Sequence, residues 1–350
     1  MNVLAMLMMN PSQVVAHLTP IARLSQVEKL HIVRPTRVRF PADNIVWHDA
    51  GPHGRLSTLL RMHRTADRVL ATEPIDYVVA INPVPYGLMA WRLAKRWRKP
   101  ISISLIGNDY YDHCHAWYGP LLRGVLRRCD AVTGTGQKMV ESFRAWGVPQ
   151  QAARVLPHSL DLARFQPRTP LAARPYDAVC CGKLIHRKRV DLVIRAFAQV
   201  LESHPQAKLA IVGDGPLRAD LESLASALGA RSQIDFVGEQ PRVERFYDQA
   251  RVFLLTSDME GLPYAMLEAM SCGCVPICTR CGTIEDVLVD GTNGFLVERD
   301  DWQSVARRTS ELLADRSHLE ALSQAALAER EHLDWDSAER VWQAAFEQAA

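Results

Sequence analysis

Short apolar runs alternate with longer amphipathic stretches along the first half of the chain. The apolar runs predict strands at residues 2–8, 27–33, 77–81, 101–106, 131–135 and 154–157. Apolar residues at helical spacing predict helices at residues 12–24, 56–70, 86–98, 121–129 and 137–146. The interval 34–55 is rich in proline and shows neither period, so we expect irregular structure there. The alternation indicates a doubly wound α/β fold with a parallel sheet.

A second series of such stretches follows the proline-rich residues 161–175, which we interpret as a linker. Strands are predicted at residues 177–181, 208–212, 234–237, 252–255 and 274–278, and helices at residues 191–202, 217–228, 243–249, 302–313, 318–329 and 337–349. A chain of 350 residues exceeds the usual size of one domain. We therefore expect two α/β domains, residues 1–165 and 166–333, and a final helical segment, 334–350, that packs toward the first domain.

The overall composition is that of a globular protein, with 48% hydrophobic and 23% charged residues. No apolar run approaches the roughly 18 residues of a membrane span. The N-terminal residues have neither a basic leader nor a small-residue cleavage site, so they predict a first strand and a cytoplasmic protein.

Charge is distributed unevenly, because residues 1–165 carry a formal net charge of +10 and the remaining residues carry −8. Two interpretations stay open. The halves could be complementary to each other, or the basic half could contact an anionic acceptor or the anionic inner face of a membrane. We expect no nucleic-acid partner.

Four of the eight cysteines, Cys272, Cys274, Cys278 and Cys281, follow the spacing C-x-C-x3-C-x2-C. Such a cluster suggests zinc, but ligand pairs in structural zinc sites usually leave roughly two to four residues between them. A single residue separates Cys272 from Cys274, and Cys-Val-Pro-Ile-Cys is typical of a buried strand. We therefore interpret these cysteines as core residues and expect no disulfide framework.

Two glutamates, Glu260 and Glu268, are separated by seven residues around a Gly-Leu-Pro turn. Gly261 and Pro263 predict a loop followed by the start of a helix. Glu260 would then lie in the loop and Glu268 on the helix, beside free backbone N–H groups. Carboxylates accept hydrogen bonds from hydroxyl groups, so this stretch predicts a site for a ligand rich in hydroxyls.

Basic and glycine-containing loops at the ends of three other predicted strands should converge on the same edge of the sheet. They contain Lys183 and Lys188, Gly213 and Gly215, and Gly238. Lysines beside helix N-termini are suited to a diphosphate. Together with the two glutamates they indicate a nucleotide-diphosphate sugar, whereas the lysines alone would favour a solvated basic loop.

In the first half, Asp109, His113 and His115 follow the predicted strand 101–106. Ligands of doubly wound sheets bind beyond the carboxyl ends of the strands. We therefore expect these side chains on the lip of a cleft between the domains. Loop histidines are more often simply solvated, so Asp109 is the preferred candidate.

Several motifs of the second half form one consistent set. They are Gly182-Lys183-Leu184 with Lys188, Val212-Gly213-Asp214-Gly215-Pro216, Phe236-Val237-Gly238, Ser257 with Glu260-Gly261-Leu262-Pro263, Leu267-Glu268-Ala269-Met270 with Gly273, Gly282 with Glu285, and Asp290-Gly291 with Asn293-Gly294-Phe295-Leu296-Val297. The first half adds Ile106-Gly107-Asn108-Asp109, and Leu156-Pro157 with Asp161 and Phe165. This set resembles the retaining glycosyltransferases of family 4. The resemblance implies the GT-B fold, in which two Rossmann-like domains face a cleft.

The resemblance also implies roles. Lys183 and Lys188 would bind the donor diphosphate and stabilise its charge as it leaves, Glu260 would bind the transferred sugar, and Glu268 would bind the ribose. With Asp109, the expected catalytic residues are Glu260, Lys183 and Lys188. The expected donor-binding residues are Lys183, Lys188, Gly213, Gly215, Gly238, Glu260, Gly261, Leu262, Pro263, Tyr264 and Glu268. The resemblance further implies that no metal or other cofactor is needed. It also implies that the anomeric configuration is retained and that the leaving phosphate itself helps to deprotonate the acceptor.

The chain departs from the family pattern at three places. Lys183 stands where arginine is usual, His158-Ser159 stand where Asn-Gly is usual, and Met9-Asn10-Pro11-Ser12 lacks the paired glycines that often touch the donor phosphate.

We predict a retaining hexosyltransferase that moves a sugar from a nucleotide sugar, with UDP favoured, to a glycan or lipid-linked acceptor. The expected setting is bacterial cell-surface polysaccharide or glycolipid synthesis. The alternatives are a GT-B sugar-nucleotide epimerase, a glycogen-synthase-like enzyme, and a catalytically silent sugar-nucleotide-binding subunit.

Overall fold

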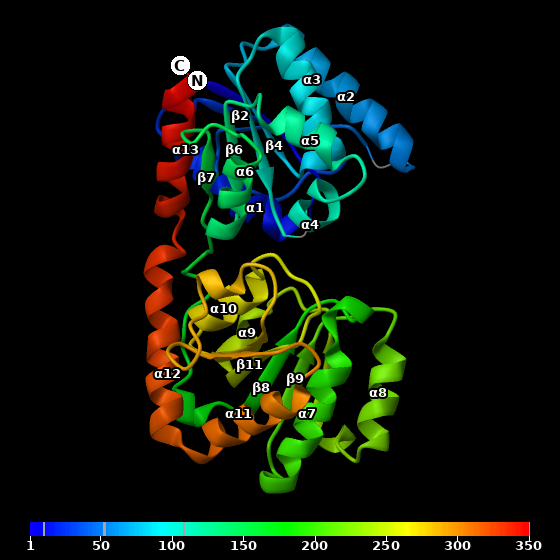
Figure 1. Ribbon diagram of the computed structural model, residues 1–350, viewed down its shortest axis with the longest axis vertical. Helices are drawn as coiled ribbons and strands as arrows, with labels where there is room; N and C mark the ends of the chain where they lie inside the picture. Colours follow the sequence, from blue (N-terminus) through cyan, green and yellow to red (C-terminus); the bar gives the residue numbers. More distant parts are fainter. Residues whose placement is uncertain (10, 52–53, 108, 350) are drawn as a thin grey trace. The chain divides into compact units, whose positions relative to one another are not determined.

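The computed structural model describes residues 1–9, 11–51, 54–107 and 109–349 and divides the chain into two compact units (Figure 1). The first unit comprises Met1–Ser159 and Asp334–Ala350, and the second comprises Leu160–Leu333. The units therefore divide a few residues before the expected position 165. The reason is that Leu160 and Phe165 are already buried in the core of the second unit.

The first unit is built on a parallel sheet with the strand order β3-β2-β1-β4-β5-β6-β7. Its central strands are buried along their whole length, as expected where helices cover both faces of a sheet. The strands are β1 (Asn2–Met6), β2 (Lys29–Arg34), β3 (Ile45–Asp49), β4 (Tyr77–Ile81), β5 (Ile101–Leu105), β6 (Ala131–Gly134) and β7 (Ala153–Val155).

Helices cover the two faces of this sheet. Helices α2, α3, α5 and α6 contribute to one core cluster, and α1 contributes with α13 to the other. Figure 1 shows α13, in red, beside the first unit although it lies at the end of the chain. The helices are α1 (Pro11–Arg23), α2 (Arg55–Thr72), α3 (Leu88–Trp97), α4 (Asp109–Cys114), α5 (Gly119–Leu126), α6 (Gln137–Ala145) and α13 (Trp335–Ala349).

Two expectations for the first unit were wrong. The interval expected to be irregular contains β3, which pairs in parallel with β2 at the edge of the sheet. Its side chains are mostly half-buried, so the strand lacks the apolar run that marks a central one. The segment expected to be a loop around Asp109 forms the short helix α4. Asn10 and Asn108, which belong to two of the sequence motifs, lie outside the described residues.

The second unit has a parallel sheet with the strand order β10-β9-β8-β11-β12-β13. The loops after β8, β9 and β11, which carry Lys188, Gly213 and Glu260, therefore leave from inner strands of the sheet, where loops at the carboxyl edge come together. The strands are β8 (Tyr176–Cys181), β9 (Leu209–Val212), β10 (Ile234–Gly238), β11 (Ala250–Leu255), β12 (Val275–Thr279) and β13 (Phe295–Val297).

Helices again cover both faces. Helices α7, α8 and α11 bury apolar residues on one face, α9 and α10 on the other, and α12 contributes to both clusters. The helices are α7 (Val190–Ser203), α8 (Arg218–Ala227), α9 (Glu244–Asp248), α10 (Tyr264–Ser271), α11 (Trp302–Ala314) and α12 (Arg316–Ala328). Within the described ranges, no helix is both long and apolar enough to cross a bilayer.

Candidate donor site in the second unit

The loops that follow β8 and β9 are tied together through their backbones. Leu184 N donates to Asp214 O at 2.9 Å. Gly213 has φ +137°, and a Cβ added there would lie 1.9 Å from the carbonyl oxygen of Gly182. A Cβ at Gly215 would lie 2.3 Å from the carbonyl oxygen of Leu184. Glycine is therefore required at both positions for the two loops to approach this closely.

The loop after β10 joins the same edge. Gly213 N donates to Gly238 O at 2.8 Å. Gly238 has φ +79°, a conformation that favours glycine. Three of the glycines expected at the donor site therefore meet at the carboxyl edge of this sheet, where their backbones shape the loops.

Lys188 and Glu260 form an ion pair at this edge. Lys188 lies in the helical turn His186–Lys188 after β8, and Glu260 lies in the loop after β11. Lys188 Nζ is 2.5 Å from Glu260 Oε1, and the two side chains are only 19% and 10% exposed. Lys183, in the same loop as Lys188, is exposed. The structure thus brings one predicted phosphate ligand into direct contact with the predicted sugar ligand.

A close backbone contact holds the loop that carries Glu260. Gly282 has φ +61°, and a Cβ added there would lie 2.0 Å from Glu260 O. Thr283 N donates to Gly261 O at 3.2 Å. Pro263 precedes α10, so the helix begins at Tyr264, one residue later than the Pro263 start that the sequence suggested.

Glu268 lies on α10, about one turn from the helix start at Tyr264, in a strongly desolvated position. Burial raises its pKa to about 7, while a hydrogen bond from Tyr247 and the charge of Arg164 oppose the rise. Tyr247 Oη donates to Glu268 Oε2 at 3.2 Å. Glu268 is therefore a carboxyl group that exchanges its proton near neutral pH, with one fixed hydrogen-bond donor.

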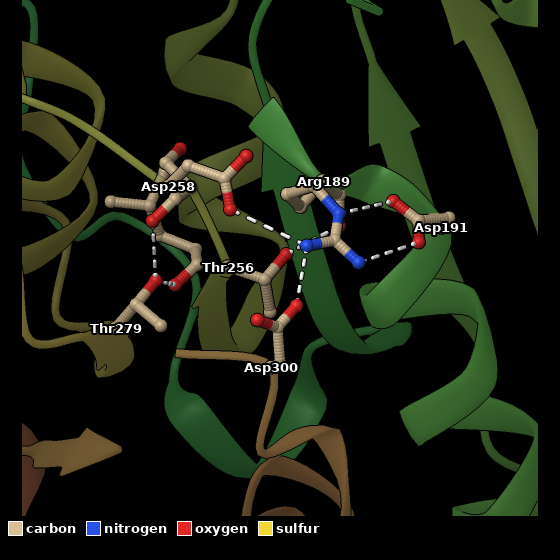
Figure 2. A network of polar contacts seen from close by, with 8 residues as sticks. Arg189, Asp191, Thr256, Asp258, Thr279 and Asp300 are labelled. Atoms are coloured by element: carbon tan, nitrogen blue, oxygen red, sulfur yellow. Dashed lines mark hydrogen bonds and ion pairs between the residues drawn. The ribbon is translucent and has the colours of Figure 1, made fainter. Parts of the chain in front are cut away.

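Arg189, a basic residue of the loop after β8 that was not among the expected site residues, links three loops of this edge (Figure 2). Its Nε and Nη2 donate to Asp191, and its Nη1 donates to Asp258 at 3.4 Å and to Asp300 at 2.5 Å. Thr256 Oγ1 donates to the Arg189 carbonyl oxygen at 2.7 Å. The loop of Lys188 is thereby fastened to the loops that follow β11 and β13.

A second set of contacts reinforces this network. Asp258 N donates to Arg187 O at 2.9 Å. Thr279 Oγ1, at the end of β12, donates to the carbonyl oxygens of Leu255 and Ser257 at 3.1 and 3.0 Å. Asp258 and Asp300 lie far from Arg189 in the sequence, so no local spacing could have marked its role in joining the loops. Its basic neighbours and its position next to Lys188 were the available signal.

In the first unit, Asp109 begins α4 at the carboxyl edge of the sheet. Burial raises the pKa of Asp109 to about 6, although two hydrogen bonds favour its ionised form. Asn82 Nδ2 and Ile106 N each donate to Asp109 Oδ2 at 3.1 Å. His113 Nδ1 contacts Tyr118 Oη at 2.6 Å, and exposed His115 contacts the α4 backbone. The histidines thus have local partners.

The two units are matched by different family models. The model described as "Glycosyl transferases group 1" matches residues 163–329, and the model described as "Glycosyl transferase 4-like domain" matches residues 14–158. The chain belongs to glycosyltransferase family 4.

Curated relatives of this family 4 chain are named as glycosyltransferases of different products. It is 32% identical over 219 residues to a GDP-mannose-dependent alpha-(1-6)-phosphatidylinositol monomannoside mannosyltransferase of Mycolicibacterium smegmatis, a match that covers 56% of this chain and 57% of the relative. It is 28% identical over 215 residues to the putative colanic acid biosynthesis glycosyltransferase WcaL of Escherichia coli, covering 59% and 52%. The matches span about half the length of these relatives.

Solved structures show that the chain has the GT-B fold. HepE of Anabaena, crystallised with UDP, superposes with a TM-score of 0.80 at 16% identity, covering 98% of each chain. Sucrose-phosphate synthase of Thermosynechococcus elongatus superposes with a TM-score of 0.78 at 17% identity, covering 99% of each chain. At these sequence identities, the structural likeness establishes the fold of the family 4 chain and nothing further about it.

The four closely spaced cysteines of this family 4 chain lie in the core of the second unit, as the sequence predicted. Cys272, Cys274, Cys278 and Cys281 are all buried in one core cluster. Cys274 Sγ donates to the carbonyl oxygens of Tyr247 and Ala250 at 3.0 and 3.2 Å, so its thiol is used in packing. Among the described residues, no group of three or more His, Cys, Asp or Glu side chains is arranged to hold a metal ion.

Proposed function

We propose that the protein is a retaining glycosyltransferase that moves a hexose from a nucleotide-diphosphate sugar to a glycan or lipid-linked acceptor. The observation that carries the proposal is the Lys188–Glu260 contact, which places a cation and a hydroxyl-binding carboxylate at one point of the carboxyl edge. A sugar attached to a phosphate would fit this arrangement, with the phosphate beside Lys188 and the sugar hydroxyls beside Glu260. The neighbouring carboxyl group of Glu268 supplies a third polar group for the ribose.

The phosphate part of the donor would be bound by Lys183 and Lys188. Both would form charge-assisted hydrogen bonds to the diphosphate and stabilise the negative charge that develops as it leaves. The backbone N–H groups of Leu262 and Tyr264, beside the start of α10, would add neutral donors. Lysine charge would thus do what a metal ion does in other transferases, and we propose that no metal is needed.

The sugar part would be bound by Glu260. Its carboxylate accepts hydrogen bonds from sugar hydroxyls, and Gly282 holds its backbone in place. Glu268 would accept from the ribose hydroxyls. Hydrogen bonds from hydroxyl groups favour the ionised form of a carboxyl group. Binding of the nucleotide sugar would therefore lower the pKa of Glu268 and release its proton.

The acceptor would be bound by the first unit. Asp109, with its raised pKa, would hold an acceptor hydroxyl, and the leaving phosphate would take the proton of that hydroxyl. If the acceptor hydroxyl attacks the same face of the sugar ring that the phosphate leaves, the anomeric configuration is retained.

A UDP-sugar is the favoured donor, supported by the structural neighbour crystallised with UDP, whereas one relative is named for GDP-mannose. The relatives named for colanic acid and phosphatidylinositol mannoside synthesis support cell-surface polysaccharide or glycolipid synthesis as the setting. We place the protein in the cytoplasm, in peripheral contact with the anionic inner face of a membrane through its basic first half.

Thermal unfolding with UDP-, GDP- and ADP-sugars tests the proposal. A stabilising donor should then be consumed only when an acceptor is present, with the product anomer matching the donor. An epimerase would change the sugar without an acceptor, and a silent binding subunit would be stabilised without turnover. No stabilisation by any nucleotide would overturn the proposal.

A further inference from the structure

Arg34, the last residue of β2, is a buried arginine that has no anionic partner among the residues the structure describes. The residue is 4% exposed. Its Nη2 donates to the carbonyl oxygen of Met9 at 3.0 Å. Across the described ranges, its Nε and Nη1 have no hydrogen-bond partner, although both atoms are buried. Most of the donor capacity of the guanidinium is therefore unused.

A buried cation without a counter-ion is costly, because its hydration is lost and nothing replaces it. Burial lowers the pKa of Arg34, and no carboxylate offsets that effect. Asp49 is the neighbour of Arg34 in the β2–β3 register, but its exposed carboxylate accepts from Gly51 N at 2.8 Å. The first unit thus keeps a desolvated positive charge that its own described residues do not neutralise.

The position of Arg34 is on the ligand-binding edge of the sheet. Its guanidinium reaches the loop that follows β1, where this chain lacks the glycine pair described above. The strand order β2-β1-β4-β5 places Arg34, Asn82 and Asp109 along the same carboxyl edge. Strands are spaced about 5 Å apart, so Arg34 and the end of β4 are separated by roughly 10 Å. That separation is comparable with the length of a phosphorylated sugar.

We propose that Arg34 binds a phosphate or carboxylate group of a substrate at the loop that follows β1. The guanidinium would turn from the Met9 carbonyl oxygen and donate to two oxygens of the anion through a bidentate contact. The identity of the substrate rests on the proposed function. Two sources have the required chemistry, namely the donor diphosphate and an acceptor that carries an anionic group.

The competing explanation is that Arg34 only tethers Met9. A tether would contribute the same stability whether or not an anion is present. An anion-binding residue would contribute stability that grows with the anion concentration, because a ligand stabilises the state that binds it. Thermal unfolding of the full chain at increasing inorganic phosphate therefore separates the two.

The variants are Arg34→Gln, Arg34→Lys and the matched control Arg37→Gln, which removes an exposed arginine on the same segment. They are made in the Lys188→Ala background, so that phosphate bound at the proposed donor site does not mask the effect. We expect phosphate to stabilise the background and the Arg37→Gln control alike. Arg34→Gln should weaken the apparent phosphate affinity about tenfold.

Calorimetry with UDP on chains that retain Lys188 identifies the source of the anion. A UDP affinity that also falls about tenfold in Arg34→Gln points to the donor diphosphate, and an unchanged affinity points to an anionic acceptor. If Arg34→Gln fails to fold, Arg34→Lys provides the test. Lysine keeps the positive charge but cannot make the bidentate contact of a guanidinium, so its phosphate affinity should fall.

The proposal is overturned if phosphate affinity is the same in the Arg34 variants and the control, or if phosphate stabilises none of them. These outcomes are independent of the proposed function. That function would fail if wild-type protein bound no nucleotide, a result that leaves the phosphate comparison intact.

Discussion

Lys188 Nζ lies 2.5 Å from Glu260 Oε1, although 72 positions separate the two residues. Each side chain is largely withdrawn from water, so either charge would be costly without the other. In this structure each charge of the pair is neutralised by the other. A sugar diphosphate would give each member a new partner, the phosphate for Lys188 and the hydroxyls for Glu260.

Removing the carboxylate of Glu260 should strongly reduce transfer without abolishing nucleotide binding. Glu260→Gln leaves Lys188 free for phosphate, so we expect UDP affinity to be kept or increased while kcat falls by roughly a hundredfold or more. Steady-state kinetics and calorimetry measure the two effects separately. The control is Glu239→Gln, an exposed glutamate next to Gly238. Full activity of Glu260→Gln would remove this residue from the site.

Removing the cation should weaken nucleotide binding. Lys188→Ala loses a charge-assisted contact to phosphate, so we expect the Kd for UDP to rise about tenfold or more. It also leaves Glu260 partly buried without its partner, so the free energy of unfolding should fall. The double variant Lys188→Ala with Glu260→Ala should recover part of that loss.

Calorimetry and urea unfolding of the four chains of this cycle provide the test. The matched control is Lys208→Ala. Lys208 is an exposed lysine just before β9, at the end of the sheet opposite to the carboxyl edge. An unchanged Kd for UDP in Lys188→Ala would contradict the assignment to phosphate.

Glu268 should make stability fall as pH rises. Its pKa increases from the ordinary 4.5 to about 7 in the folded chain, so between these values the folded chain holds a proton that the unfolded chain releases. The contribution is complete below the unfolded pKa and is lost as pH passes the folded one, by up to about 3 kcal/mol. Asp109, whose pKa is also raised, contributes a slope in both proteins, so urea unfolding between pH 4.5 and 8 should show a steeper fall in stability in the wild type than in Glu268→Gln. Equal slopes in the two proteins would refute it.

Arg189 should act through the loops that it joins. Arg189→Ala loses the contacts to Asp191, Asp258 and Asp300, so we expect lower stability and a raised KM for the donor. Arg189 has φ +47°, which glycine adopts freely. Arg189→Gly should therefore be more stable than Arg189→Ala by about 1 kcal/mol, measured by urea unfolding. If the alanine variant were the more stable one, backbone strain at this position would be disproved.

Membrane contact should depend on the exposed basic residues of α3. Arg96 pairs with Asp67 at 3.2 Å, which leaves Arg92 and Lys95 as the better probes. Reversing both to glutamate should release the protein from phosphatidylglycerol vesicles in co-sedimentation, whereas Arg307→Glu on α11 should not. Absence of binding by the wild type would end the membrane hypothesis.

Local pattern determined much of the fold. The run at β4 was predicted to the residue, because a strand buried on both faces is a continuous apolar run. The prediction from pattern failed at β3, because half-buried side chains at a sheet edge carry little periodic signal. Glycines such as Gly213 and Gly215 were singled out by sequence, but the reason for them, a backbone approach between two loops, appears only in three dimensions.

The sequence by itself determined which residue types the donor site contains and which strands deliver them, since apolar period and loop position are properties of neighbouring residues. The tertiary structure decided which of those residues meet. Lys188 contacts Glu260 and Lys183 does not, Arg189 joins loops from three strands, and Arg34 is left without a counter-ion among the described residues. Contact, burial and the resulting pKa values depend on chain segments that are distant in sequence, because parallel strands bring their carboxyl ends together whatever the length of chain between them.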